Sequence, residues 1–344
     1  RIETPDRVSV ILFLELSATL RACRTGQYNL SVNLPLPVIW TGDSLAILDQ
    51  RALPHLETYI EARTSGDVAT AIREMAVRGA PLIGIAAAYG LALAYIRGED
   101  VGAAKEALAG ARPTAINPAR ALERVARARD PVAEAVAIHE EEKERCLRMA
   151  RHGAELIKPG SAVLTHCNTG VLATGGIGTA LGVIYKAWEL GRVRTVWVDE
   201  TRPWLQGARL TSWELGRVGV PHTLIVDGLA AFLMARGKVD AVLVGADRVA
   251  ANGDVANKVG TLSLAISARH FGVPFYVVAP STSFDPHVPD GKAIPVEERS
   301  EEEVLSFGGI RAAPGGTRAL NYSFDITPSC LITAYITEEG VREA

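Results

Sequence analysis

The sequence has few cysteines, and none of them are paired at a short spacing. Its four cysteines stand far apart, without a CxxC pair, at positions Cys23, Cys146, Cys167 and Cys330. Widely spaced single cysteines are typical of reduced thiols in a cytoplasmic protein, whereas small secreted scaffolds are dense in cysteine. We therefore expect no disulfide and a cytoplasmic location.

The chain also lacks a positive net charge and closely spaced histidines, which argues against a nucleic-acid-binding protein and against a metalloprotein. The net charge is -3 at pH 7, so the chain has no overall basic field to attract nucleic acid. The seven histidines include no close pair at a metal-ligand spacing. We expect neither nucleic-acid binding nor a metal site.

Near its N-terminus the chain has one short apolar run, Val8–Leu14. The run cannot span a bilayer, because a spanning helix needs roughly 20 apolar residues. Acidic residues at Glu3, Asp6 and Glu15 flank it and argue against a secretory signal. We treat residues 1–35 as an extension of unknown role and expect no membrane association.

The sequence is rich in apolar residues, which follow two successive patterns. With 344 residues, 48% of them hydrophobic, the chain can bury a large core and divide into two domains. Residues 36–150 have mostly helical periodicity, with helices expected at Val68–Val77 and Ile83–Ala94 and a long linking helix at Ala121–Ala150. Residues 151–344 alternate between strand and helix patterns.

This alternation predicts an α/β fold, with a Rossmann-like parallel sheet domain on the C-terminal side and a smaller, mostly helical N-terminal domain. The expected strands are 162–165, 195–199, 223–226, 241–244 and 275–278, and the expected helices between them are 179–190, 208–218, 229–235 and 258–271. In such sheets, ligands bind beyond the carboxyl ends of the strands. The polar residues that follow these ends include Cys167, Glu200, Arg202, Asp227, Asp247 and Arg248.

The stretch Ser161–Leu190 places an apolar strand, a cysteine-bearing loop and a helix in immediate succession. Its glycines do not follow the GxGxxG spacing of dinucleotide-binding loops. Cys167 lies where the strand ends and the loop begins. From the residues alone, Cys167 can be a catalytic thiol or a small buried residue, and Asp247 can be an acid-base group or a turn former.

The segment Val244–Lys258 predicts a phosphate site. Asn257 and Lys258 stand at the expected entrance of the next helix. Helix N-terminal amides, an amide side chain and a lysine together offer donors and positive charge to an oxyanion. Lys258 can equally be a solvated first-turn residue, and Arg78 and Arg112 can each cap a helix end or face solvent.

A series of motifs, taken in order and spacing, resembles the methylthioribose-1-phosphate isomerase family. The motifs are RGAP, IGIAAAYG, RPTAIN, LTHCNTG, ETRPWLQGARLTSWEL, VGADRVAANGDVANKVGT, PFYVVAP, IPVEER and FDITP. The resemblance covers the chain from about Trp40 onward. Ribose-1,5-bisphosphate isomerases and regulatory subunits of a translation-initiation exchange factor share this fold. Thr169 and Ser212 stand where the family often has alanine.

The resemblance implies catalytic roles for Cys167 and Asp247. It implies substrate-binding roles for Arg78, Gly79, Ala80, Arg112, Gln206, Asn257 and Lys258. It also implies a homodimer that needs no metal or other cofactor. Its partner is then a small sugar phosphate, bound in the cleft between the two domains.

The implied reaction is the isomerisation of 5-methylthioribose 1-phosphate to 5-methylthioribulose 1-phosphate in methionine salvage. Because the anomeric oxygen carries the phosphate, the sugar cannot open to a free aldehyde. An acid and a base in a dry pocket would assist ring opening while hydrogen moves from carbon 2 to carbon 1, as a proton or as a hydride. We expect an apolar lining to raise the pKa of Asp247 and helix amides to lower the pKa of Cys167.

Two alternatives follow from the same resemblance. A bisphosphate isomerase would need a second phosphate site in place of an apolar pocket for the methylthio group. A non-catalytic regulatory subunit would have no reason to keep both Cys167 and Asp247.

Overall fold

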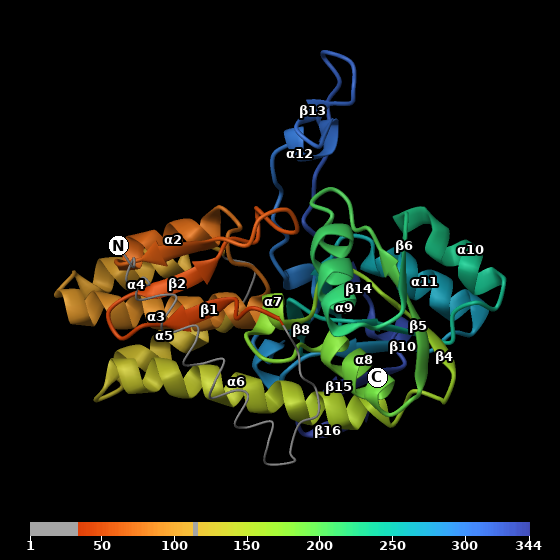
Figure 1. Cartoon of the computed structure of the whole chain (residues 1–344), viewed down its shortest axis with the longest axis horizontal. Coiled ribbons are helices and arrows are strands. Elements are labelled where there is room, and N and C mark those ends of the chain that lie inside the picture. Colours follow the sequence, from red (N-terminus) through yellow and green to blue (C-terminus); the bar gives the residue numbers. More distant parts are fainter. Residues whose placement is uncertain (1–33, 113–115) are drawn as a thin grey trace, which may run out of the picture.

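The computed structural model describes residues 34–112 and 116–344, which form two lobes with a long helix lying along both (Figure 1). This helix is α6 (Pro131–Ala154), and it packs against α3 in the first lobe and against α8 in the second. The extension expected at residues 1–35 lies outside the described residues, apart from its last two.

The first lobe is mostly helical, as its periodicity predicts. Its elements are the antiparallel strands β1 (Val38–Trp40), β2 (Leu45–Leu48) and β3 (Tyr59–Ala62) and the helices α2 (Ser65–Arg73), α3 (Ala80–Arg97), α4 (Val101–Ala109) and α5 (Asn117–Arg127). Helix α3 packs against α2, α4, α5 and α6 and supplies most of the apolar core of this lobe.

Helix α3 is apolar on every side, and its residues from Ala80 to Ala94 are all buried. By length and composition it could cross a membrane, but 83% of that apolar stretch is buried inside the protein, as in the core helix of a globular lobe. Gly79 precedes the helix with a φ of 90°, a conformation that favours glycine. A Cβ atom at Gly79 would lie 2.6 Å from the backbone of Ala173 in the second lobe, so the start of α3 can approach that lobe only without a side chain.

The helix expected at Val68–Val77 begins and ends earlier than the sequence predicts. Thr64 and Asp67 form a capping box, in which each side chain bonds the backbone amide of the other, and this sets the start of α2 at Ser65. The chain leaves the helix before Met75, whose φ of 67° is left-handed. Residues 75–77 therefore form a tight turn that leads into Arg78.

The single helix expected at Ala121–Ala150 is two helices, α5 and α6. Pro131 opens α6, and a proline at the first turn both lacks an amide donor and keeps the residue before it out of the helical region. The side chain of Asp130 then caps α6 by accepting from the amides of residues 132 and 133. Helix α6 continues past residue 150, so the division of the chain into domains at 150/151 stays a prediction.

The second lobe is built around a seven-stranded sheet in the order β16, β15, β10, β7, β4, β5, β6. Its strands are β4 (Ser161–Thr165), β5 (Val193–Asp199), β6 (His222–Ile225), β7 (Ala241–Val244), β10 (Phe275–Val278), β15 (Ala334–Thr337) and β16 (Gly340–Glu343). All neighbours pair in parallel except β15 with β16. The five strands that the sequence predicts are present, and the α/β, Rossmann-like fold is confirmed.

The order of the strands reverses between β4 and β7. From β4 the chain proceeds through β5 and β6 toward one edge, and from β7 it proceeds through β10 and β15 toward the other. Such a switch point leaves a crevice beyond the carboxyl ends of the strands, where open α/β sheets bind ligands. Cys167 follows β4 and Asp247 follows β7, so both lie at this crevice.

The helices of the second lobe cover the sheet and carry its crossovers. They are the short α7 (Val171–Thr174), α8 (Ala180–Glu189), α9 (Ser212–Val218), α10 (Ala230–Ala235) and α11 (Thr261–Phe271). A π-helical turn, Gly207–Thr211, precedes α9, and the two together fill the helix expected at 208–218. A hairpin of β12 (Ser306–Phe307) and β13 (Ile310–Arg311), preceded by α12 (Glu302–Leu305), projects from this lobe (Figure 1).

A second, four-stranded sheet corrects one prediction at the site. It consists of β11 (Phe284–Asp285), β8 (Arg248–Ala250), β9 (Val255–Lys258) and β14 (Phe324–Thr327) in that order. Asn257 and Lys258 belong to β9 and pair with β14. They therefore precede α11, which begins at Thr261, and do not open it. Pairing with a strand that lies far along the sequence extends β9 to Lys258, and local sequence cannot reveal this.

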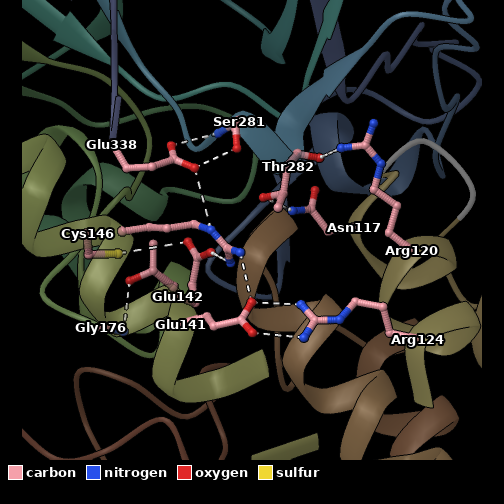
Figure 2. A network of polar contacts seen from close by, with 12 residues as sticks. Asn117, Arg120, Arg124, Glu141, Glu142, Cys146, Gly176, Ser281, Thr282 and Glu338 are labelled. Carbon is pink, nitrogen blue, oxygen red and sulfur yellow. Dashed lines mark hydrogen bonds and ion pairs between the residues drawn. The ribbon is translucent and has the colours of Figure 1, made fainter. Parts of the chain in front are cut away.

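Polar side chains join the helices of the first lobe to the loop that follows β10 (Figure 2). Asn117 donates from Nδ2 to Thr282 Oγ1 (3.2 Å). Arg120 of α5 donates to the carbonyl oxygens of Thr282 (2.7 Å) and Phe284 (2.8 Å). These contacts hold α5 against the loop that contains Pro280.

Helix α6 carries the rest of this network. Arg145 pairs with Glu141 (2.9 Å) and Glu142 (3.4 Å) on the same helix and with Glu338 (3.5 Å) after β15. Glu141 also accepts two hydrogen bonds from Arg124 of α5 (Figure 2). Burial raises the pKa of Glu142 to about 8, against the opposing charge of Arg145. Glu142 is therefore mostly protonated at neutral pH.

The raised pKa of Glu142 predicts a pH dependence of stability. Between its unfolded value of about 4.3 and its folded value of about 8, the folded protein keeps a proton that the unfolded chain loses, so stability falls as pH rises through this window. Glu142→Gln, which is always neutral, should gain at least about 1 kcal/mol relative to wild type between about pH 5 and about pH 8.5. Urea unfolding at both pH values measures this.

Glu141→Gln is the matched control on the same helix. Its hydrogen bond with Arg124 lowers the pKa of Glu141, so this variant should lose a little stability and show no gain as pH rises. An unchanged difference between Glu142→Gln and wild type at the two pH values would contradict the prediction.

Candidate active site

One cavity between the lobes brings together the nine residues that the sequence predicts for the site. They are Arg78, Gly79, Ala80, Arg112, Cys167, Gln206, Asp247, Asn257 and Lys258. The start of α3 forms one wall, and the loops after β4 and β7 form another. Glu200, Arg202, Asp227 and Arg248 follow the carboxyl ends of the same sheet but do not line this cavity.

Cys167 is held in an unusual backbone conformation from two sides. Its φ is 61°, in the left-handed region that non-glycine residues rarely occupy. The amide of Cys167 donates to Thr201 Oγ1 (2.9 Å), and its carbonyl oxygen accepts from Thr211 Oγ1 (2.6 Å). Strained residues of this kind persist only where the surrounding structure over-determines them, and they gather at functional sites.

His166 ties the cysteine loop to the residue that follows Lys258. Its Nδ1 lies 3.0 Å from Asp199 Oδ2, and its Nε2 lies 2.9 Å from the carbonyl oxygen of Val259. A carbonyl only accepts, so Nε2 carries a proton, and a further proton lies between Nδ1 and the carboxyl group. Burial opposes the charged form, but the hydrogen bond that His166 donates to Asp199 raises the pKa of His166.

The same histidine belongs to the group of side chains with ligand atoms close enough to hold a metal ion. These are His166, Asp199 and Asp227, whose ligand atoms lie within 4.8 Å of one another. Both ring nitrogens of His166 already have protein partners. Asp227 accepts from the amides of Thr201 (2.7 Å) and Arg202 (2.8 Å). The contacts of this group are therefore those of a structural hydrogen-bond network.

Asp247 has the raised pKa that the sequence predicts. Burial is the main cause, and the charges of Lys258, Arg112 and Arg78 oppose it. The amide of Asp247 donates to the carbonyl oxygen of Ala256 (2.9 Å), which fixes the residue beside β9. A carboxyl group with a raised pKa can donate a proton near neutral pH.

The pKa expected for Cys167 is wrong. Burial raises the pKa of the thiol, although the charges of Arg78 and Lys258 pull it down. The adjacent helix α7 has only four residues, and its amides at Val171 and Leu172 donate to the carboxylate of Glu214. These amides are therefore not free to stabilise a thiolate.

Three buried or nearly buried cations surround the cysteine and the aspartate. Arg78 is 8% exposed and donates to the backbone oxygen (2.9 Å) and to the side-chain oxygen of Asn168. Lys258 is 8% exposed and lies over the ring of Phe324, with Nζ 4.7 Å from its centroid. Arg112 forms an ion pair with Glu297 (3.4 Å). The interpretation of these cations as solvated helix-end residues is therefore wrong.

The helix that opens onto the cavity is α3, not α11. Asp325 accepts from the first amides of α11, at Gly260 (2.7 Å) and Leu262 (3.1 Å), and so occupies that helix end. The start of α3 has no side-chain cap, and Gly79 and Ala80 line the cavity. A long helix presents positive partial charge and amide donors at its N-terminus, which suits an anion.

Gln206 also presents a polar group that lacks a protein partner. The residue precedes the π-helical turn and is 1% exposed, and its Oε1 atom has no hydrogen-bond partner among the described residues. A buried carbonyl of this kind is costly unless a ligand or water donates to it. It is therefore suited to accept from a hydroxyl group of a bound sugar.

Several lining residues do not appear among the sequence predictions. They are Met75, Pro81, Asn168, Thr169, Ala173, Thr174, Thr179, Gly245, Ala246, Pro280 and Phe324. Asn168 and Thr169 lie in the LTHCNTG motif, so their position beside Cys167 could have singled them out. Pro280 and Phe324 lie in the PFYVVAP and FDITP motifs, but only the packing of distant strands brings them to the cavity.

Comparisons with known proteins agree on one family. The model of the initiation factor 2 subunit family matches residues 76–344. A methylthioribose-1-phosphate isomerase from Thermus thermophilus is 54% identical over 299 residues, which are 86% of this chain and 90% of that protein. The crystal structure of 5-methylthioribose 1-phosphate isomerase from Pyrococcus horikoshii is similar with a TM-score of 0.83 at 42% identity, covering 92% of this chain and 95% of the other.

A structure with a different name is also similar. It is described as translation initiation factor eIF-2B, subunit delta, from A. fulgidus, with a TM-score of 0.77 at 41% identity, covering 90% of this chain and 96% of the other. The fold alone therefore does not separate the isomerases from the subunits of a translation factor.

The raised pKa of Cys167 predicts slow alkylation. The thiolate is the reactive form, so iodoacetamide at about pH 7.5 should modify Cys167 at least about tenfold more slowly than the exposed Cys330. Peptide mapping by mass spectrometry follows each cysteine, and the urea-unfolded protein, in which both should react alike, is the control. Modification of Cys167 as fast as Cys330 would contradict the raised pKa.

Proposed function

This chain belongs to the initiation factor 2 subunit family, and we propose that it is a methylthioribose-1-phosphate isomerase. It converts 5-methylthioribose 1-phosphate to 5-methylthioribulose 1-phosphate in methionine salvage. The observation that supports this most directly is the joint presence of Cys167 and Asp247 in one cavity with three cations. A subunit that only bound a ligand would not need both an acid and a thiol.

We propose that Asp247 is the proton donor of the reaction. Ring opening of a sugar that carries phosphate on its anomeric oxygen needs an acid, and burial raises the pKa of the Asp247 carboxyl group, which favours its proton-donating form. The Cys167 thiol is kept neutral by burial and can donate a hydrogen bond to negative charge that develops in the transition state. These roles agree with the raised pKa of Cys167, which disfavours a thiolate.

We assign the phosphate to the three cations of the cavity. Arg78, Arg112 and Lys258 supply positive charge, and the start of α3 at Gly79 and Ala80 supplies amides. Asn257 and Gln206 complete the polar lining as partners for the sugar. Both residues are less than a tenth exposed, so their bonds to substrate would form away from bulk water.

Apolar side chains also line the cavity and are suited to the methylthio group. They are Met75, Pro81, Ala173, Pro280 and Phe324. Two of them contact the cations, because Arg112 donates to Met75 Sδ (2.7 Å) and Lys258 lies over the ring of Phe324. A second phosphate facing the other three side chains would lose hydration without gaining donors from them, which costs free energy. This favours a methylthio sugar over a ribose bisphosphate.

Assaying the two sugar phosphates side by side tests this function. Purified protein should convert 5-methylthioribose 1-phosphate to its ketose, followed by NMR of the product, and should act poorly on ribose 1,5-bisphosphate. Preference for the bisphosphate would replace the proposed substrate, and inactivity toward both would favour the regulatory alternative.

Two substitutions test the assigned residues. Cys167→Ser and Asp247→Asn should each lower kcat by at least about a hundredfold, a typical loss for an acid-base group, while substrate binding survives. The double variant should be little worse than either single variant, because groups that act as a unit are not additive. A Cys167→Ser protein within about tenfold of wild type would return Cys167 to a packing role.

We also propose a cytoplasmic homodimer. Three exposed apolar side chains, Leu224, Val226 and Phe232, lie on and after the edge strand β6. Strand edges and exposed apolar side chains are both surfaces that a second copy can cover. An isologous contact that places this face against itself would bury them.

The dimer is testable in solution. Small-angle scattering at micromolar concentration should give the mass of two chains, and Leu224→Glu should shift the protein toward the monomer. Leu320→Glu, at a leucine that is 66% exposed against 46% for Leu224, is the control and should leave the mass unchanged. A monomer mass for the unmodified protein would remove the proposal.

A further inference from the structure

Glu214 is a fully buried carboxylate that the proposed chemistry does not use. It lies in α9, has no exposed surface, and is surrounded by hydrogen-bond donors. Oε1 accepts from Asn168 Nδ2 (2.8 Å) and from the amide of Leu172 (3.3 Å). Oε2 accepts from the amide of Val171 (2.9 Å) and from the hydroxyl group of Tyr185 (3.2 Å). Burying an isolated carboxylate costs free energy. The four donors gathered around this one therefore require an explanation.

The contacts of Asn168 determine which way its side-chain amide points. Its Oδ1 atom faces Arg78, and an arginine can only donate, so the oxygen must lie on that side. The amide nitrogen therefore faces Glu214, as its 2.8 Å contact with Oε1 requires. A continuous chain of hydrogen bonds runs from Glu214 through Asn168 to the guanidinium group of Arg78.

The backbone around the cysteine loop leaves room for this carboxylate. A Cβ atom at Gly170 would lie 2.0 Å from Glu214 Oε2, far inside contact distance. Only glycine at this position lets the carboxylate approach the loop that carries Cys167 and Asn168. The close approach indicates that the loop and Glu214 fit one another specifically.

Both hydrogen-bond acceptors that the Arg78 guanidinium group has among the described residues belong to Asn168. One terminal nitrogen of Arg78 donates to the backbone oxygen of Asn168 (2.9 Å), and the other donates to Oδ1. The Nε atom is buried without a protein partner among the described residues. Asn168 is therefore the hydrogen-bonding support of the guanidinium group, and Glu214 is the support of Asn168.

We propose that Glu214 is a positioning residue of the active site, which orients the Arg78 guanidinium group toward the substrate phosphate through the side-chain amide of Asn168. The role of Arg78 at the phosphate rests on the proposed function. Glu214 itself does not line the cavity and acts only through its partners. Burial lowers the pKa of Arg78, and the nearby charge of Glu214 opposes that shift.

Glu214→Gln is the direct test. A glutamine has one acceptor oxygen where the carboxylate has two. The backbone amide of Val171 cannot turn, so we expect the glutamine oxygen at the Oε2 position and its amino group at the Oε1 position, facing Asn168. Asn168 then turns its oxygen toward the glutamine and its amino group toward Arg78, which loses an acceptor. We expect KM for the sugar phosphate to rise at least about tenfold with a smaller fall in kcat, the pattern of weakened substrate binding. Tyr185→Phe removes another donor to Glu214 without touching Asn168 and should keep KM within about twofold.

A double-mutant cycle separates positioning from a purely structural role. In an Arg78→Ala background, Glu214→Gln should raise KM by less than about twofold, because the group through which it acts is gone. A full tenfold effect in that background would overturn the proposal, and so would an unchanged KM in a folded Glu214→Gln protein.

A further variant keeps the test decisive if Glu214→Gln does not fold. Asn168→Ala leaves Glu214 its backbone and tyrosine donors and removes the middle of the chain, together with a hydrogen bond to Thr211 Oγ1 (3.2 Å), so KM should again rise at least about tenfold. A wild-type KM for Asn168→Ala would overturn the proposal. In each case, activity of the unsubstituted protein on the sugar phosphate tests the proposed function separately. The proposed function and the proposed role of Glu214 can therefore fail independently.

Discussion

The parallel pairing of β4 with β7 is the constraint on which the site depends. Residues 163–165 align with residues 241–243, so the two strands end side by side at the switch point of the sheet. The loop after β4 carries Cys167, and the loop after β7 carries Asp247. Each loop then receives its own support: threonine hydroxyl groups hold Cys167, and a backbone bond to β9 holds Asp247. Side chains separated by 80 positions in the sequence reach one cavity because their strands are neighbours.

Burial controls the electrostatics of this cavity. Low dielectric disfavours every charged form, so it raises the pKa of Asp247 and of Cys167 and lowers the pKa of Lys258. The cations and the acid then stabilise one another, and the three opposing charges partly offset the cost of burial. Arg112 already pairs with Glu297, whereas the hydrogen-bond acceptors of Arg78 belong to the neutral Asn168, so a phosphate would add negative charge beside these cations. The cavity is thus poised to gain from binding an anion.

The first lobe supplies and positions residues that line the cavity. Helix α3 is buried along most of its length, and its start is placed against the second lobe by the close approach of Gly79 to Ala173. The contacts of Asn117 and Arg120 with the loop after β10 also hold α5 against the second lobe. The cavity at the start of α3 therefore depends on both lobes, and residues from both line it.

The sequence by itself determined the α/β fold and the five central strands, because apolar alternation is a local property of the chain. Its motifs also singled out nine candidate site residues, which the structure brings into one cavity while their roles stay a proposal. It could not determine that Lys258 ends a strand, since that depends on pairing with β14, nor that Asp325 occupies the start of α11. It also predicted the wrong direction for the pKa of Cys167. Motif and helix position suggested an activated thiol, but only the tertiary structure shows that Glu214 takes the α7 amides and that burial dominates. Local patterns specify elements, whereas the contacts between distant elements decide solvation and hydrogen bonding at the site.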